Sequence, residues 1–190
     1  SPLYKATISS LAGGSINEYL ITSQDGEQYN HTGGFDDEGV FLKEIPVSLI
    51  LPNQTNCLPC LGSFSDGEYD LFNMPFTLIT PVSNNNTIQI SDNESFSLEY
   101  ILFGEGGVEL IKKTTTFFAN NYLSQHEFYI NEQHLSYLSN LELIWLEGLR
   151  PTEEKIFEDT QYSSGIISQS EEMEDIQTND PKKRINRIVY

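Results

Sequence analysis

The sequence predicts a mainly β fold, a sandwich or a barrel, with one packed α-helix; an α+β arrangement is the alternative. Apolar and polar residues alternate over many short segments, which is typical of half-buried strands. Turn residues separate these segments at spacings of about 8 to 12 residues, as in sandwiches and barrels. A hydrophobic content of 38%, with 10 tyrosines and 11 phenylalanines, is enough for a substantial core.

Two hairpins are the strongest local signals. Ser23-Gln24-Asp25-Gly26 separates the strand-like segments 18–22 and 27–31, and Asp-Gly between such segments is a hairpin signature. A second hairpin is predicted to join residues 87–91 to residues 96–103. The other expected strands are residues 3–8 at a sheet edge, 40–43, 47–51, 76–80, 127–130 and 141–146.

The one helix is expected from about residue 107 to residue 122. Apolar-facing residues recur there at spacings of three and four, as one face of a helix would require: Val108, Ile111, Thr115, Phe118 and Tyr122. Lys112 and Lys113 fall off this face. The three consecutive threonines 114–116 oppose a helix, because β-branched side chains lose rotamer freedom there.

Charge divides the chain into a body and an extension. Residues 1–150, predicted to form one β-rich globular domain, hold 5 basic and 19 acidic side chains, giving −14. Residues 151–190 form a charged C-terminal extension, in which 151–181 hold 1 basic and 9 acidic residues (−8) and 182–190 hold 4 basic residues and no acidic one (+4). Such an extension buries too little apolar surface to fold alone, so we expect a neighbouring chain to hold it.

The negative body excludes two classes of partner. It repels phosphate backbones and anionic lipids, so neither nucleic acid nor membrane is expected. No apolar stretch approaches the roughly 18 residues that a spanning helix needs. A basic protein surface or a divalent cation suits the body better.

Cys57 and Cys60 form the only cysteine pair and are the candidate metal ligands. Zinc would need two more ligands, and no histidine lies at finger-like spacing. A redox pair should open a helix, whereas the loop-like residues 61–67 follow. Structural cysteines, a zinc site and a redox pair therefore stay open.

Two acidic loops, residues 33–39 and 66–70, are candidates for calcium, which prefers oxygen ligands. Neither matches the twelve-residue calcium loop with its closing Glu, and solvated turns are the simpler interpretation. No Gly-x-Ser-x-Gly motif or phosphate-binding glycine loop is present. We therefore predict no catalytic residue, no enzyme activity and no bound cofactor, with zinc and calcium as the alternatives.

Part of the chain resembles the middle of CRISPR repeat-processing endoribonucleases. The resemblance covers residues 57–130 and consists of Cys57 to Cys60, Pro75-Phe76-Thr77-Leu78 and the segment 93–104 that leads into the expected helix. It implies cleavage of repeat RNA. The glycine-rich loop that those proteins use against RNA is missing here, and the charge of −14 opposes RNA binding, so this activity is a remote alternative.

The favoured function is a non-enzymatic structural or interaction subunit of a larger assembly, such as a virion, a tail or a secreted machine. This interpretation favours a virion or extracellular location over a cytoplasmic one and implies a homo- or hetero-oligomer. The basic end would dock on a neighbouring subunit, as an added strand or through its charges, by Lys182, Lys183, Arg184, Arg187, Ile188 and Tyr190. The alternatives are a calcium- or carbohydrate-binding adhesion module and, for the arm, a solvated terminus.

Overall fold

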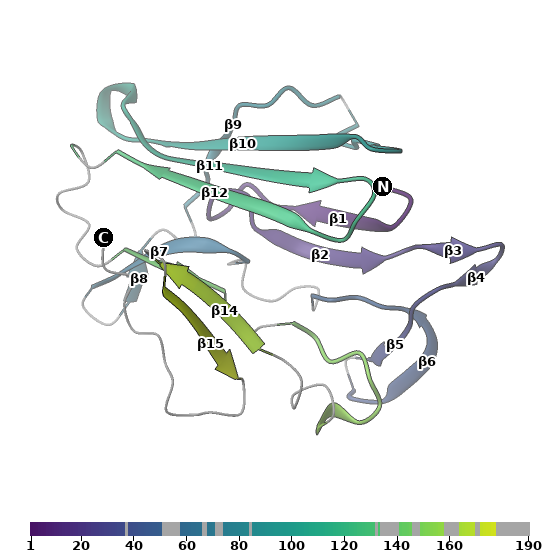
Figure 1. Cartoon of the computed structure of the whole chain (residues 1–190). Helices are drawn as coiled ribbons and strands as arrows, with labels where there is room; N and C mark the ends of the chain where they lie inside the picture. The colour runs from purple at the N-terminus through teal and green to yellow at the C-terminus, as the bar shows by residue number, and fades with distance from the viewer. Residues whose placement is uncertain are drawn as a thin grey trace.

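The computed structural model describes residues 1–36, 38–50, 58–65, 68–70, 74–83, 85–131, 133, 141–145, 149–157, 164–169 and 172–177 (Figure 1). Within them the protein is mainly β, with antiparallel sheets throughout. Apart from Ile156 and Phe157, the described helical residues form one 3-10 turn, η1 (Glu105–Gly107). No helix in this part of the chain is long and apolar enough to cross a membrane.

The largest sheet has four antiparallel strands in the order β12-β11-β10-β9 (Figure 1). They are β9 (Thr77–Leu78), β10 (Ser95–Phe103), β11 (Glu109–Phe118) and β12 (Ser124–Ile130). The η1 turn joins β10 to β11, with Gly106 at φ 71° and Gly107 at φ 78°. Glycine adopts these angles without the steric cost that a Cβ brings, so the glycine pair ends β10 in a hairpin turn.

The helix predicted from 107 to 122 is wrong, because residues 109–118 are strand β11. Ile111, Lys113, Thr115 and Phe117 are buried in strict alternation. A strand here places Lys113 on the core face, and lysine is rarely fully buried. The helical interpretation avoided the cost of burying a lysine, and for that reason it was favoured wrongly. The β-branched threonines 114–116, which favour strands, pointed to the observed structure.

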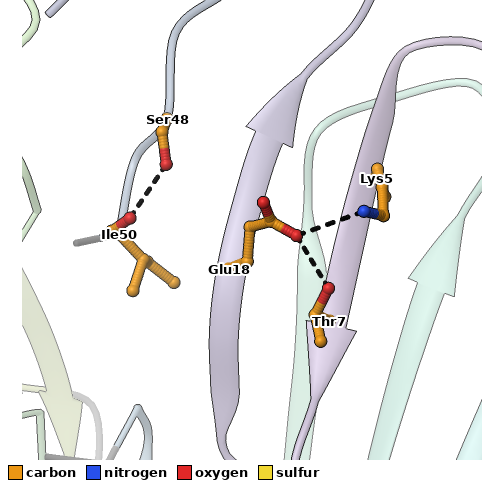
Figure 2. Close-up of polar contacts among 5 residues, drawn as sticks. All are labelled: Lys5, Thr7, Glu18, Ser48 and Ile50. Carbon is orange, nitrogen blue, oxygen red and sulfur yellow. Dashed lines mark hydrogen bonds and ion pairs between the residues drawn. The ribbon is translucent and has the colours of Figure 1, made fainter. Parts of the chain in front are cut away.

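A two-stranded sheet, β1 (Tyr4–Ile8) and β2 (Ile16–Ile21), packs against the large sheet as a second layer. Its outer face is held by one carboxylate across the strand pair (Figure 2). Glu18 Oε2 accepts a 2.8 Å hydrogen bond from Thr7 Oγ1 and lies 3.4 Å from Lys5 Nζ. These contacts support the register of the two strands.

The outer edge of β2 is covered by the segment that follows β6 (Phe41–Pro46). Ile21 N donates to the Val47 carbonyl oxygen at 2.8 Å, and Leu49 N donates to the Tyr19 carbonyl oxygen at 2.9 Å. Ser48 Oγ donates to the Ile50 carbonyl oxygen at 2.8 Å and rigidifies the segment (Figure 2). Of the strand predicted at 47–51, the described residues form a single β-bridge, between Ser48 and Leu20. Because this segment covers β2, the unpaired outer edge of the two-stranded sheet belongs to β1 within the described residues.

Tyrosines join the two layers. The rings of Tyr4 and Tyr19 stack with centroids 4.7 Å apart, and the Phe117 ring lies 6.4 Å from that of Tyr4. Tyr4 Oη donates to the Phe118 carbonyl oxygen at 2.8 Å, and Tyr19 Oη donates to the Tyr122 carbonyl oxygen at 2.9 Å. Burial raises the pKa of both phenols, so they remain neutral donors.

Four small sheets complete the described structure. They pair β3 (Gln24–Asp25) with β4 (Gln28–Tyr29), β5 (Thr32–Phe35) with β6, β7 (Cys60–Ser65) with β8 (Glu68–Asp70) and β13 (Leu141–Ile144), and β14 (Ser164–Gln169) with β15 (Glu172–Gln177).

Most predicted strands are confirmed with shifted ends. Segments 3–8, 18–22, 40–43, 76–80, 127–130 and 141–146 contain or overlap β1, β2, β6, β9, β12 and β13. The hairpin at Asp25-Gly26 forms with a different first arm from the one predicted, because β3 pairs with β4 whereas residues 18–21 of β2 pair with β1. The hairpin between 87–91 and 96–103 is wrong. Residues 87–91 lie outside the strands, because β11 and β9 occupy the two edges of β10.

Candidate functional site

A lysine amine lies in the core between the two layers. Lys113, on the inner face of β11, is 0% exposed. Its Nζ donates to the Gly14 carbonyl oxygen at 3.0 Å and to the Pro59 carbonyl oxygen at 2.6 Å. The Phe128 ring of β12 lies over the amine, 5.3 Å from Nζ to the ring centroid. One side chain therefore connects the β1–β2 loop, the segment before β7 and the large sheet.

Burial makes this amine unusual. The described residues form no ion pair with Lys113, and desolvation lowers its pKa to about 7. A lysine with such a pKa is half neutral near pH 7 and is a potential nucleophile or base. However, its complete burial and its two carbonyl acceptors close it to any substrate.

The loop that accepts the amine needs its two glycines. A Cβ at Gly13 would lie 3.3 Å from Lys113 Cδ and 3.0 Å from the Phe76 ring. A Cβ at Gly14 would lie 2.5 Å from Tyr100 Cε2, and both glycines have positive φ. The loop therefore approaches Lys113 and Tyr100 closely only because it lacks these side chains.

A second polar group lies beside Lys113, at the edge of the sheet. His126 of β12 is bonded through Nδ1 to Thr115 Oγ1 at 3.1 Å and through Nε2 to Ser124 Oγ at 3.0 Å. Desolvation, followed by the charge of Lys113, lowers the pKa of His126 to about 4. The imidazole is therefore neutral at physiological pH, and both nitrogens have partners.

This group resembles a catalytic triad only in its Ser–His contact. In a triad a carboxylate orients Nδ1 and stabilises the imidazolium that forms, whereas Thr115 supplies a hydroxyl here. With a pKa near 4, His126 is also a poor proton acceptor for a serine hydroxyl. The arrangement anchors β12 to β11 and is not built for acyl transfer.

The helical interpretation set Lys113 off the apolar face and did not predict its burial, and His126 was not among the predicted site residues. Both nitrogens of His126 are bonded, so the side chain is a satisfied part of the sheet. The available signal was the β-branched run 114–116, which favours a strand. In the strand, Lys113 shares the buried face with Ile111 and Thr115.

The predicted metal ligands have a different status. Cys60 is disulfide-bonded, and the sequence contains one other cysteine, Cys57, which lies outside the described residues. A metal would need the reduced thiolate of Cys60. Among the described residues no group of three or more His, Cys, Asp and Glu side chains is placed to hold a metal ion. The zinc prediction at Cys57 and Cys60 stays a prediction.

The acidic loop between β5 and β6 uses its carboxylate for its own turn. Asp36 Oδ1 accepts hydrogen bonds from the backbone N–H groups of Glu38, at 3.0 Å, and Val40, at 2.8 Å. This is the ordinary role of aspartate in a turn. The second loop lies partly outside the described residues, and the partner-binding residues lie wholly outside them: Lys182, Lys183, Arg184, Arg187, Ile188 and Tyr190.

The fold and this site define a mainly β protein with a two-layer core. No family model, curated protein or solved structure matches the chain. Its function is therefore argued from its own residues.

Proposed function

We propose that this protein is a non-enzymatic structural or interaction subunit of a larger assembly of the virion, tail or secreted-machine type, and that its C-terminal extension docks on a neighbouring subunit. The observation that carries the proposal is the hairpin of β14 and β15. These strands pair with each other and with no other described strand (Figure 1). A two-stranded hairpin alone is at best marginally stable in water, so contact with a neighbour would stabilise it.

One face of this hairpin presents apolar side chains to solvent. Ile166 is 67% exposed and Met173 is 76% exposed. Ile166 pairs with Asp175 and Ser168 pairs with Met173, so the two apolar side chains are diagonal neighbours on one face. Exposed apolar groups placed together are typical of protein contacts.

Charge supports the same partner class. The +4 segment 182–190 follows the hairpin, and the body of each copy carries −14. Opposite charges on two surfaces accelerate association and set its specificity. A second copy of this chain therefore offers a complementary surface to the basic end of the first.

The core chemistry favours a structural role over an enzymatic one. Lys113 and His126 have shifted pKa values, which often mark active sites. Both side chains are instead hydrogen-bonded to other residues of the chain. Their role is to join strands and loops.

The first test is deletion of residues 182–190, with association followed by light scattering at low and moderate salt. We expect the full chain to associate, more weakly as salt screens the charges, and the truncated chain to remain monomeric. Unchanged association of the truncated chain would remove the extension from the proposal.

A charge-matched pair of variants separates docking from general charge. Arg184→Gln/Arg187→Gln removes two charges from the basic end, and Lys5→Gln/Lys43→Gln removes two from the body. Both body lysines are well exposed and their ion pairs are of the weak surface kind. We expect the first variant to associate less and the second to behave as the parent; equal effects would contradict docking through the basic end.

A further inference from the structure

We infer that the outer edge of β12 is the acceptor for the basic segment 182–190 of a second copy, which adds to the four-stranded sheet as a further strand. The inference rests on the proposed function and names the surface that receives the extension. It is carried by the backbone geometry of β12, which leaves a row of hydrogen-bonding groups without partners among the described residues.

The register of the sheet shows which groups these are. Asn131 N donates to the Leu110 carbonyl oxygen at 2.9 Å, and β12 continues from there in an unbroken antiparallel register with β11. In an antiparallel pair, the backbone N–H and C=O groups of every second residue bond to the partner strand. The backbone groups of the residues between them point away from that strand. Gln125, Glu127 and Tyr129 therefore bond to β11. The backbone N–H and C=O groups that point outward belong to Ser124, His126, Phe128 and Ile130.

The opposite edge of β11 agrees with this assignment. Ala119 N donates to the Glu94 carbonyl oxygen at 2.9 Å, which sets Phe117, Thr115, Lys113 and Ile111 as the residues that bond to β10. The backbone groups of Lys112, Thr114 and Thr116 therefore bond to β12, opposite Tyr129, Glu127 and Gln125. This is the same assignment as the one obtained from Asn131.

The outward groups of β12 find no acceptor or donor among the described residues. A strand of seven residues with such an edge is a template for another strand. The side chains of His126, Phe128 and Ile130, which point toward the core, are only partly buried. An added strand would bond the edge and cover these side chains.

The edge of β1 is a poorer acceptor. It is shorter, and the carbonyl oxygen of Tyr4 already accepts the amino group of Ser1 at 3.0 Å. On the solvent face of the β1–β2 sheet, Glu18 is already paired with Lys5, whereas Glu127 on the solvent face of β12 forms no ion pair among the described residues. Charge therefore favours β12 for this occupant.

The occupant has the composition of a strand. Segment 182–190 ends in Arg-Ile-Asn-Arg-Ile-Val-Tyr, in which Ile185, Ile188, Val189 and Tyr190 are residues that strands favour. It contains no proline that would interrupt a ladder. Addition of a peptide strand to a sheet edge derives affinity from such main-chain bonds.

The test uses the full chain with a proline placed on the edge. His126→Pro removes an outward N–H and leaves the bonds to β11, since proline is tolerated where the N–H of an edge strand faces solvent. His126→Ala is the matched control, because it loses the same imidazole and keeps the N–H. We expect association by light scattering to weaken at least about tenfold in the proline variant relative to the alanine variant.

A second pair of variants keeps the test valid if His126→Pro fails to fold. Ser124→Pro and Ser124→Ala repeat the comparison at the first residue of β12, where proline disturbs a strand least. As a probe of the occupant, a synthetic peptide of residues 182–190 should compete with association, and the same peptide with Ile188→Pro should compete less at equal charge. Melting temperatures identify a variant that has lost its fold.

The outcomes separate the two proposals. If truncation at 181 abolishes association but both proline variants associate as their alanine partners do, the proposed function stands and β12 is not the acceptor. If truncation changes nothing, or the full chain stays monomeric, both proposals fall. Equal competition by the two peptides would show charge attraction without strand addition and would overturn the inference.

Discussion

Lys113 Nζ donates a 2.6 Å hydrogen bond to the carbonyl oxygen of Pro59, a residue 54 positions earlier in the chain. The same amine bonds the Gly14 carbonyl oxygen, 99 positions earlier. A buried cation usually requires a paired anion, but no acidic side chain among the described residues forms an ion pair with Lys113. Desolvation by burial lowers the pKa of Lys113, and this shift makes the stability of the fold depend on pH.

Stability is expected to rise with pH from about 7 to about 10.5 because of Lys113. Its folded pKa is about 7, against 10.5 for an ordinary lysine, so between these values the unfolded chain binds the extra proton. The slope is at most about 1.4 kcal/mol per pH unit. Urea titrations from about pH 7 to about pH 9.5 measure it.

The control is Lys113→Met, which keeps nearly the length of the side chain and cannot titrate. The Ser1 amino group has a lowered pKa and contributes in the same direction, but it is present in both proteins. The difference between the parent and the variant therefore reports Lys113 alone. A constant difference across this range would mean that the amine is not desolvated.

His126 predicts a second dependence, in acid. Its folded pKa of about 4 lies below the ordinary 6.5, so protons bind preferentially to the unfolded chain between these values. Stability should fall as the pH is lowered from about 6.5 toward 4. His126→Gln should lack this part of the loss. Parallel stability curves for the two proteins between about pH 6.5 and about pH 5, where few carboxylates titrate, would contradict the prediction.

Gly14→Ala is expected to destabilise the fold severely. The new Cβ would lie 2.5 Å from Tyr100 Cε2, at φ +87°. Gly26→Ala is the control, because Gly26 also has positive φ, at +62°, but no atom lies within 4 Å of its Cβ position. We expect about 1 kcal/mol for Gly26→Ala and several-fold more for Gly14→Ala, by urea denaturation. Similar losses would show that Tyr100 can move aside.

Tyr19→Phe tests the contact between the layers. It keeps the ring stacked on Tyr4 and removes the hydroxyl that donates to the Tyr122 carbonyl oxygen. The expected loss in free energy of unfolding is about 1 kcal/mol, the usual net value of one hydrogen bond. Tyr29→Phe, on the exposed β4, should change nothing. A neutral result for Tyr19→Phe would mean that water replaces this bond.

Local sequence predicted those elements whose signal is local. The Asp25-Gly26 turn and the alternation along β1, β12 and β13 each identify a strand within a few residues. Strand β9 lies inside the predicted segment 76–80. In these places the chemistry of the turn or the period of the pattern suffices, because neither depends on a distant partner.

The sequence by itself determined the β class, the short strands and the opposition between an acidic body and a basic end. Only the tertiary structure decided that 109–118 is a strand, because burial of Lys113 depends on carbonyl groups of Gly14 and Pro59 that are distant in sequence. It also decided the partners of β10 and the outward edge of β12. Both follow from pairing between strands, whose energy comes from long-range contacts that no local pattern records.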